Sequence, residues 1–299
     1  MPEMPEVQGL VEFLGGRVAG VEIARASVAN IAALKTYDPP IDALRGAQIE
    51  DVSRHGKFVD LRTSAGHLVF HLAKAGWLRW YDRLPTTIVK PGRTPIALRV
   101  ALGDGAGFDL TEAGTKKSLA VYVVRDPAEV PGIARLGPDP LDPGFTRDTL
   151  AGLLAGRRTQ IKGVLRDQAV IAGVGNAYSD EILHVARMSP YAIAATLDDD
   201  DLDRLHTAMI ETLTQAIAAA SGKPPADLKD AKRRGMQVHG RRGEACPVCA
   251  DTVRSVFFAD KLRVSTVARG DSGSSWEYCP TCQTKGKILA DRRLSRLLK

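Results

Sequence analysis

All four cysteines of this 299-residue chain fall into two Cys-x-x-Cys pairs close to its C-terminal end. Cys246 pairs with Cys249 and Cys279 with Cys282, and 29 residues separate the pairs. Each pair has the spacing of a zinc knuckle, and four thiolates around one Zn²⁺ make a closed tetrahedral structural site. The alternative is that the cysteines are two reactive dithiols or free thiols. The spacing predicts a small metal-bound module, with residues 252–258 and 274–278 forming a two-stranded hairpin between the pairs.

Positive charge is concentrated at the same end of the chain. The net charge is +6, but residues 229–299 hold sixteen Lys and Arg against seven Asp and Glu, a net of +9, so the first 228 residues carry −3. A charge asymmetry of this kind favours a polyanionic partner such as nucleic acid. A solvated basic tail is the alternative.

The overall composition is that of an ordinary globular protein. Hydrophobic residues make up 44% of the chain and charged residues 25%. No apolar run is long enough to span a membrane, and no basic and then apolar segment opens the chain. We therefore expect no membrane association and a cytoplasmic location.

The first seven residues, Met-Pro-Glu-Met-Pro-Glu-Val, place a proline second and two carboxylates close behind it. Removal of the initiator methionine would leave Pro2 with a free secondary amine, whose condensation with an aldehyde gives a charged iminium. An α-amino group has a pKa near ~8, so part of it is neutral at physiological pH. Glu3 could act as the general acid or base. A proline near a frayed end is the alternative.

The first half of the chain reads as one short helix followed by strands. Residues 5–14 show a helical apolar period, and Gly15-Gly16 is expected to end that helix. Short β-rich runs follow at residues 20–23, 48–52, 57–62, 67–72, 95–102 and 119–124. Short strands separated by turn residues predict a sandwich or barrel.

The second half is predicted to be helical. Residues 131–144 are rich in Pro, Gly and Asp and read as a linker. Helices are expected at residues 158–168, 176–187 and 202–220, with Asn176 as a possible N-cap and an aspartate run before the third helix. Residues 222–234 then read as a basic connector.

These motifs together resemble the formamidopyrimidine-DNA glycosylase/endonuclease VIII family of base-excision repair enzymes. The resemblance covers nearly the whole chain. It rests on the Pro2-Glu3-x-Pro5-Glu6-Val7 start, on Gly56-Lys57, on His71-Leu72, and on Ile161-Lys162 leading into Gly173-Val174-Gly175-Asn176, followed by Val238-His239-Gly240-Arg241 and the paired cysteines. These residues follow the order of the family's motifs, which is the context that confirms a motif.

The resemblance implies an α+β multidomain fold. Residues 1–130 would form an N-terminal helix and a catalytic β-sandwich lobe, residues 131–150 a linker, residues 151–240 a helical lobe with the helix-two-turn-helix element, and residues 241–299 a zinc-finger β-hairpin and basic tail. DNA would lie in a basic cleft between the lobes. The chain would act as a monomer, without a nucleotide cofactor.

The resemblance also assigns roles to individual residues. Pro2 would attack C1′ of the damaged nucleotide, Glu3 would donate the proton, Glu6 would position water or Pro2, and Lys57 would assist β-elimination. One Zn²⁺ would sit on the four cysteines. The residues expected to contact DNA are Lys57, His71, Lys74, Lys162, Asn176 and Arg269. Taken singly, Lys57 could be a surface lysine and Asn176 an ordinary helix cap.

Three departures from the family pattern limit what can be said of the substrate. Lys74 stands where the 8-oxoguanine enzymes insert a methionine into the gap left by the flipped base. Residues 111–117 lack the family's Arg-Arg-Phe-Gly segment, although Lys116 or Lys117 could bind phosphate instead. Ser274 replaces the arginine five residues before the third cysteine, so δ-elimination is less well supported than β-elimination.

The sequence thus predicts a bifunctional DNA glycosylase and abasic-site lyase that acts on damaged duplex or single-stranded DNA in the nucleoid. A non-catalytic damaged-DNA-binding protein of the same fold is the main alternative. A zinc-ribbon regulator is a second alternative, which the N-terminal motif and the strand-rich half do not fit.

Overall fold

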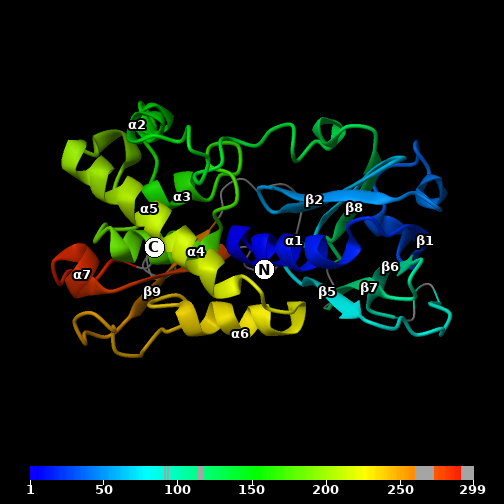
Figure 1. The fold of residues 1–299 in the computed structure, drawn as a ribbon. Coiled ribbons are helices and arrows are strands. Elements are labelled where there is room, and N and C mark those ends of the chain that lie inside the picture. Colours follow the sequence, from blue (N-terminus) through cyan, green and yellow to red (C-terminus); the bar gives the residue numbers. More distant parts are fainter. Residues whose placement is uncertain (91, 93, 114–116, 260–272, 291–299) are drawn as a thin grey trace. The chain divides into compact units, whose positions relative to one another are not determined.

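The computed structural model describes residues 1–299 except 91, 93, 114–116, 260–272 and 291–299, and the described part divides into two compact units (Figure 1). The first unit consists of Met1–Gly137 and Ala216–Lys232, and the second of Pro138–Gln215 and Arg233–Lys299. The first holds helical segments and two sheets, and the second is mainly helical with a terminal hairpin. The predicted α+β fold class is confirmed.

Helix α1 (Met4–Val18) opens the first unit. Glu3 is its N-cap, and Glu3 and Glu6 form a reciprocal capping box in which each side chain accepts from the other's backbone N–H. Leu10, Leu14 and Val18 are fully buried. The prediction that Gly15-Gly16 ends the helix was wrong: the last turn continues to Val18 because burial of that residue outweighs the low helix propensity of glycine.

Two four-stranded antiparallel sheets form the sandwich. Their strand orders are β1-β6-β7-β5 and β2-β3-β4-β8. The strands are β1 (Ile23–Val28), β2 (Ile49–His55), β3 (Phe58–Thr63), β4 (Gly66–His71), β5 (Gly76–Tyr81), β6 (Ile96–Leu102), β7 (Gly107–Glu112) and β8 (Ala120–Val124), with short 3₁₀ helices η1 (Ile31–Ala33), η2 (Ile41–Leu44) and η3 (Pro127–Glu129). Phe70 and Phe108 meet across the core, with ring centroids 6.3 Å apart. The sequence prediction missed β5 and β7 and placed the first strand too early.

The second unit contains the helices of the predicted helix-two-turn-helix region. They are α2 (Arg147–Leu154), α3 (Ile161–Leu165), α4 (Asn176–Val185) and α5 (Asp199–Ala220), with η4 (Ala194–Thr196) before α5. The end of α5, from Ala216, belongs to the first unit. The helix predicted over residues 158–168 is only the five residues of α3, and α2 was not predicted. The terminal hairpin pairs β9 (Arg254–Ala259) with β10 (Gly273–Tyr278), and α7 (Pro280–Thr284) follows.

Residues 222–234, predicted as a connector, instead contain helix α6 (Pro225–Gly235). Leu228 is fully buried and belongs to the sandwich core together with Ala220. Gly9 of α1 lies opposite, since a Cβ there would be 3.0 Å from Leu228. The segment through Lys232 is therefore part of the first unit, although it is more than 200 residues from α1 in sequence.

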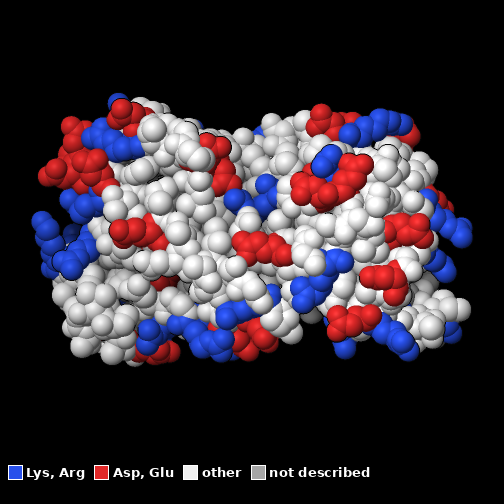
Figure 2. Space-filling model, viewed as in Figure 1, with Lys and Arg blue, Asp and Glu red and all other residues white. Residues whose placement is uncertain are grey.

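Charged side chains of both signs occur on the visible face of each unit (Figure 2). At the start of α5, Arg147 interacts with Asp148, Asp199 and Asp203, with N–O distances of 3.3 Å to Asp148 and 3.2 Å to Asp203. The three aspartates are exposed and Arg147 is only half-buried, so the ion pairs contribute little to stability. None of the helices in the described residues is both long and apolar enough to cross a membrane.

Two glycines should respond in opposite directions to substitution by alanine. A Cβ at Gly16 meets nothing within 4 Å, so Gly16→Ala should raise the free energy of unfolding by about 0.5–1 kcal/mol through helix propensity.

A Cβ at Gly76 would lie 2.1 Å from the carbonyl oxygen of Leu72, so Gly76→Ala should lower the free energy of unfolding by at least about 1 kcal/mol. Chemical denaturation measures both, and a stable Gly76→Ala protein would contradict the turn geometry.

Candidate active site

Glu3 and Glu6 lie side by side at the first turn of α1 and are each only 2% exposed. The Oε2 atom of Glu6 accepts a hydrogen bond from the backbone N–H of Glu3 at 2.8 Å. Pro2 is buried immediately before them. Carboxylates at a helix N-terminus interact favourably with the helix dipole, but burying two of them requires further compensation. The motif predicted from the sequence is thus a buried, negatively charged cluster next to the chain's N-terminus.

Lys232 of α6 supplies a positive charge to this cluster. Its Nζ lies 2.7 Å from Oε2 of Glu6 and 3.8 Å from Oε1 of Glu3. Burial alone would lower the pKa of Lys232, but the two carboxylates outweigh that effect and raise its pKa. Sequence reasoning missed this residue. The available signal was the helical spacing of Leu228 and Lys232 inside what was interpreted as a connector.

The N-terminal amine responds to the same charges. Its pKa is lowered, first by burial and then by Lys232, while Glu3 and Glu6 act in the opposite direction. In this chain the amine belongs to Met1, and the nitrogen of Pro2 is part of a peptide bond. Removal of Met1 would move the terminus one residue closer to the buried carboxylates. A lowered pKa increases the neutral, nucleophilic fraction of an amine at a given pH.

Lys57 and His71 come together at neighbouring strand ends. Lys57 immediately precedes β3 and is buried, and Phe58 pairs with His71 of β4. Burial and, second, the nearby Lys57 lower the pKa of His71 to about 4. The Nδ1 atom of His71 accepts the backbone N–H of Ala73 at 3.1 Å, so a neutral ring suits the turn. His71 is therefore a neutral hydrogen-bonding group at physiological pH.

The turn after His71 carries the predicted gap-filling segment. Lys74 is exposed there, following Ala73 in the left-handed region at φ +51°. Trp77, at the start of β5, is half-buried, and its Nε1 donates to the carbonyl oxygen of Pro225 at 3.0 Å. Of the other expected phosphate ligands near the sandwich, Lys116 lies outside the described residues, and Lys117 donates to the carbonyl oxygen of Glu112.

Asn176 is the first residue of α4, with Gly175 as the N-cap, so the prediction of an Asn cap was wrong by one residue. Its Nδ2 donates to the carbonyl oxygen of Ser275 in β10 at 3.0 Å. Its Oδ1 is buried and accepts no hydrogen bond from the described protein atoms. The start of α4 therefore combines the free N–H groups of a helix terminus with a side chain held by the hairpin.

Lys162, predicted to contact DNA, is fully buried next to α4. It forms an ion pair with Asp180, and its Nζ donates to the carbonyl oxygen of Asn176 at 3.2 Å. His239 lies on the other side of Asp180, with Nδ1 2.8 Å from Oδ2 of Asp180 and 3.4 Å from Oε2 of Glu277. Burial opposes protonation of His239, but these two carboxylates raise its pKa overall. A phosphate contact by Lys162 would require this network to open.

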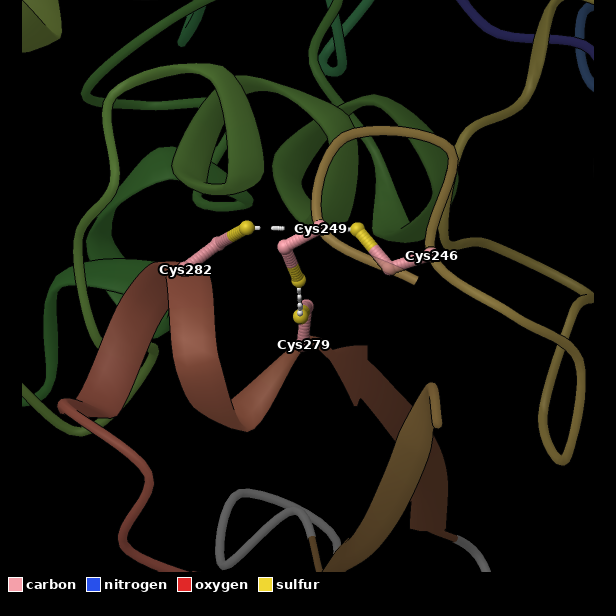
Figure 3. Close-up of side chains that lie close together, drawn as sticks. All are labelled: Cys246, Cys249, Cys279 and Cys282. Carbon is pink, nitrogen blue, oxygen red and sulfur yellow. Dashed lines mark hydrogen bonds between the residues drawn. The ribbon is translucent and has the colours of Figure 1, made fainter. Parts of the chain in front are cut away.

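The four cysteines converge on one point from the loop before β9 and from α7 (Figure 3). All four Sγ atoms lie within 4.8 Å of one another, with Cys246 to Cys282 at 3.9 Å and Cys249 to Cys279 at 3.3 Å. Four sulfurs bonded to one Zn²⁺ at ~2.3 Å in a tetrahedron would be about 3.8 Å apart, so the donor set fits a metal ion.

Arg269, which was predicted to contact DNA, falls within 260–272 and so lies outside the described residues. Ser274, at the position of the expected arginine, pairs through its backbone with Phe258 in the hairpin.

The sandwich unit with its buried acidic cluster, and the helical unit with its four-cysteine hairpin, have the fold that the resemblance implies. Family models agree. The formamidopyrimidine-DNA glycosylase N-terminal domain matches residues 1–116, and the family's H2TH domain matches residues 136–224. The chain belongs to the formamidopyrimidine-DNA glycosylase family, which confirms the predicted resemblance.

Individual relatives extend the comparison over the whole length. The chain is 34% identical to the formamidopyrimidine-DNA glycosylase of Symbiobacterium thermophilum, covering 98% of this chain and 93% of that protein. It is 54% identical to an uncharacterized formamidopyrimidine-DNA glycosylase-like protein of Mycobacterium tuberculosis, covering 58% of this chain and 99% of that one. A complex of the Lactococcus lactis Fpg with abasic-site DNA shares the fold, with a TM-score of 0.78, 22% identity and coverage of 94% and 99%.

The lowered pKa of His71 makes stability depend on pH. The folded-state pKa of about 4 lies below the unfolded value of 6.5, so the unfolded state binds more protons between these values. The contribution of His71 to stability should be fully present above pH 6.5 and be lost as the pH falls towards 4. The free energy of unfolding, measured by denaturation at several pH values, should change less steeply with pH over this range for His71→Asn than for the unaltered protein. Equal slopes would contradict the neutral ring.

Proposed function

We propose that this chain, once Met1 is removed, is a bifunctional DNA glycosylase and abasic-site lyase. The observation that carries the proposal is the buried Glu3–Glu6 cluster next to a chain terminus that would present the secondary amine of Pro2. Membership of the formamidopyrimidine-DNA glycosylase family and the similarity to a protein solved with abasic-site DNA support it. Oxidised bases and abasic sites are the proposed substrates.

The chemistry follows from the groups present. The Pro2 nitrogen would attack C1′ and form a C–N bond while the glycosidic bond breaks and its electron pair leaves with the base. Glu3 would receive the amine proton and pass it to the departing base. Opening of the sugar ring, in which the C1′–O4′ electron pair moves to O4′ and O4′ takes up a proton from water, would give an iminium, whose positive charge acidifies the C2′ proton. Loss of that proton, assisted by Lys57, would expel the 3′ phosphate and break the strand.

DNA contacts are proposed in both units. Lys57 and Lys74 would bind phosphates near the nucleophile. At the start of α4, the free backbone N–H groups and Asn176 would bind another phosphate, as helix N-termini do. Arg269 remains a predicted contact. The chain is proposed to act as a monomer.

The proposed metal is one structural Zn²⁺ held by Cys246, Cys249, Cys279 and Cys282. Zinc favours four thiolate ligands in a tetrahedron, and such a site stabilises a small module without taking part in the reaction. The four converging sulfurs support this proposal.

The altered gap-filling segment suggests a tolerant substrate preference. Lys74 stands in the exposed turn where the 8-oxoguanine enzymes carry a methionine. A lesion in single-stranded DNA leaves no gap in a duplex, so no side chain is needed to fill one. We therefore propose that single-stranded and double-stranded abasic sites are cleaved at comparable rates. Strict dependence on duplex DNA would overturn this part of the proposal.

Glu3→Gln should separate the two activities. Glutamine cannot accept and deliver a proton, so release of a damaged base should slow by about 10²-fold or more, while strand cleavage at a preformed abasic site should slow much less. Single-turnover rates on oligonucleotides carrying an oxidised base or an abasic site measure both. Glu12→Gln, on an exposed side chain of the same helix, is the matched control. Equal loss of both activities, or of neither, would contradict the role of Glu3.

The metal proposal makes a direct analytical prediction. The purified protein should contain about one zinc ion per chain, and Cys279→Ser should reduce the zinc content and make the hairpin region sensitive to protease. Val248→Ala, an exposed residue between two ligands, should keep the zinc. Finding no metal and four freely alkylated thiols in the native protein would support the dithiol alternative instead.

A further inference from the structure

Helix α6 brings to the active site a cation that the N-terminal motif does not contain. Four contacts hold the helix in place on the first unit. Leu228 packs into the core, Trp77 donates to the carbonyl of Pro225, Lys229 Nζ lies 4.4 Å from the centroid of the Trp77 ring, and Lys232 reaches Glu6. These residues lie on one face at helical spacing. The position of Lys232 is thus fixed by packing along the whole helix.

The Glu6 carboxylate is the point at which α1 and α6 meet. Its Oε2 accepts from the backbone N–H of Glu3 at 2.8 Å and from Nζ of Lys232 at 2.7 Å. The Lys232 ammonium also lies within ion-pair distance of Glu3. Two buried carboxylates so close together would repel each other and favour protonation of one of them. A half-buried ammonium shared between them offsets that repulsion.

We propose that Lys232 is a positioning residue of this active site, which holds the carboxylates of Glu3 and Glu6 in place beside the N-terminal amine. This inference rests on the proposed function. An ionised Glu3 is the form that can take the proton of the attacking amine before delivering it to the leaving base. Lys232 itself is not a nucleophile, because a protonated ammonium has no free electron pair.

The same charge acts on the amine. For the amine of Met1, burial and then Lys232 lower the pKa, Glu3 and Glu6 raise it, and Lys229 lowers it more weakly. Once Met1 is removed, the amine of Pro2 would face the same groups. From β2, Arg54 faces α1 but is engaged with Gln8, with Nε 2.9 Å from Oε1. By the same charge repulsion Lys232 would lower the pKa of the Pro2 amine, so its removal should raise that pKa and shift the rise of activity to higher pH.

The test is the pH profile of strand cleavage at an abasic site, measured under single-turnover conditions with the Met1-processed protein and corrected for cleavage without enzyme. Lys232→Met should move the midpoint of the rise up by about one pH unit, which is about a tenfold slower rate on its acid side. Lys232→Arg keeps the charge and should restore most of the profile. Arg234→Met, which removes an exposed positive charge of the same helix that is not among the groups acting on the amine, is the matched control and should shift the midpoint much less.

A double substitution keeps the test valid if Lys232→Met alone is unstable. Lys232→Met with Glu6→Gln removes one positive and one negative charge, so no additional uncompensated carboxylate is buried. Its midpoint should return towards that of the unaltered protein, even if the maximal rate is lower. A purely structural role for Lys232 would lower the rate at all pH values without moving the midpoint.

The outcomes separate the two proposals. Unaltered midpoints in Lys232→Met and in the double variant would overturn the role of Lys232 while leaving the lyase intact. Absence of cleavage by the unaltered, Met1-processed protein would overturn the proposed function, and the inference with it. An upward shift that arginine reverses and the double variant compensates would establish the positioning role.

Discussion

The burial of two carboxylates beside the N-terminus is the constraint on which the first unit depends. Glu3 and Glu6 cap α1 through their backbone contacts, yet capping alone does not balance two buried negative charges. The balancing charge comes from Lys232, and Lys232 can be there only because α6 folds onto the sandwich. The helix at residues 225–235 is therefore part of the candidate active site, although it lies far from the N-terminal motif in sequence.

A comparable arrangement organises the second unit. Lys162 is buried against Asp180, which also binds His239, and the backbone N–H of Glu277 in β10 donates to Asp180 at 3.0 Å. This network joins α4 to the hairpin that precedes the third cysteine. The position of Asn176 at the start of α4 thus depends on the hairpin, and the hairpin in turn depends on the four cysteines. In the proposed enzyme, a metal without a catalytic role would still determine how the helix terminus is presented.

The sequence predicted those features that local patterns encode. The cysteine spacing indicated their convergence, the alternating runs indicated a sandwich, and the ordered motifs indicated the family. Features set by distant contacts were missed. Gly15-Gly16 did not end α1 because Val18 is buried by residues elsewhere in the chain, and α6 was interpreted as a connector because its charges suggested solvent. The pairing of Lys232 with Glu6 spans 226 residues and has no local signature. Lys162 matched a family motif, but only the structure shows that it is buried and forms an ion pair with Asp180.

The measurement that tests the account most directly is borohydride trapping of the Met1-processed protein on an abasic-site oligonucleotide, followed by mass spectrometry of the adduct. The account predicts one covalent adduct per chain, mapped to the nitrogen of Pro2, and no adduct when Met1 is retained. Tight binding without an adduct would mean that the fold serves as a damaged-DNA-binding protein, and an adduct on a lysine would contradict the assignment of the nucleophile.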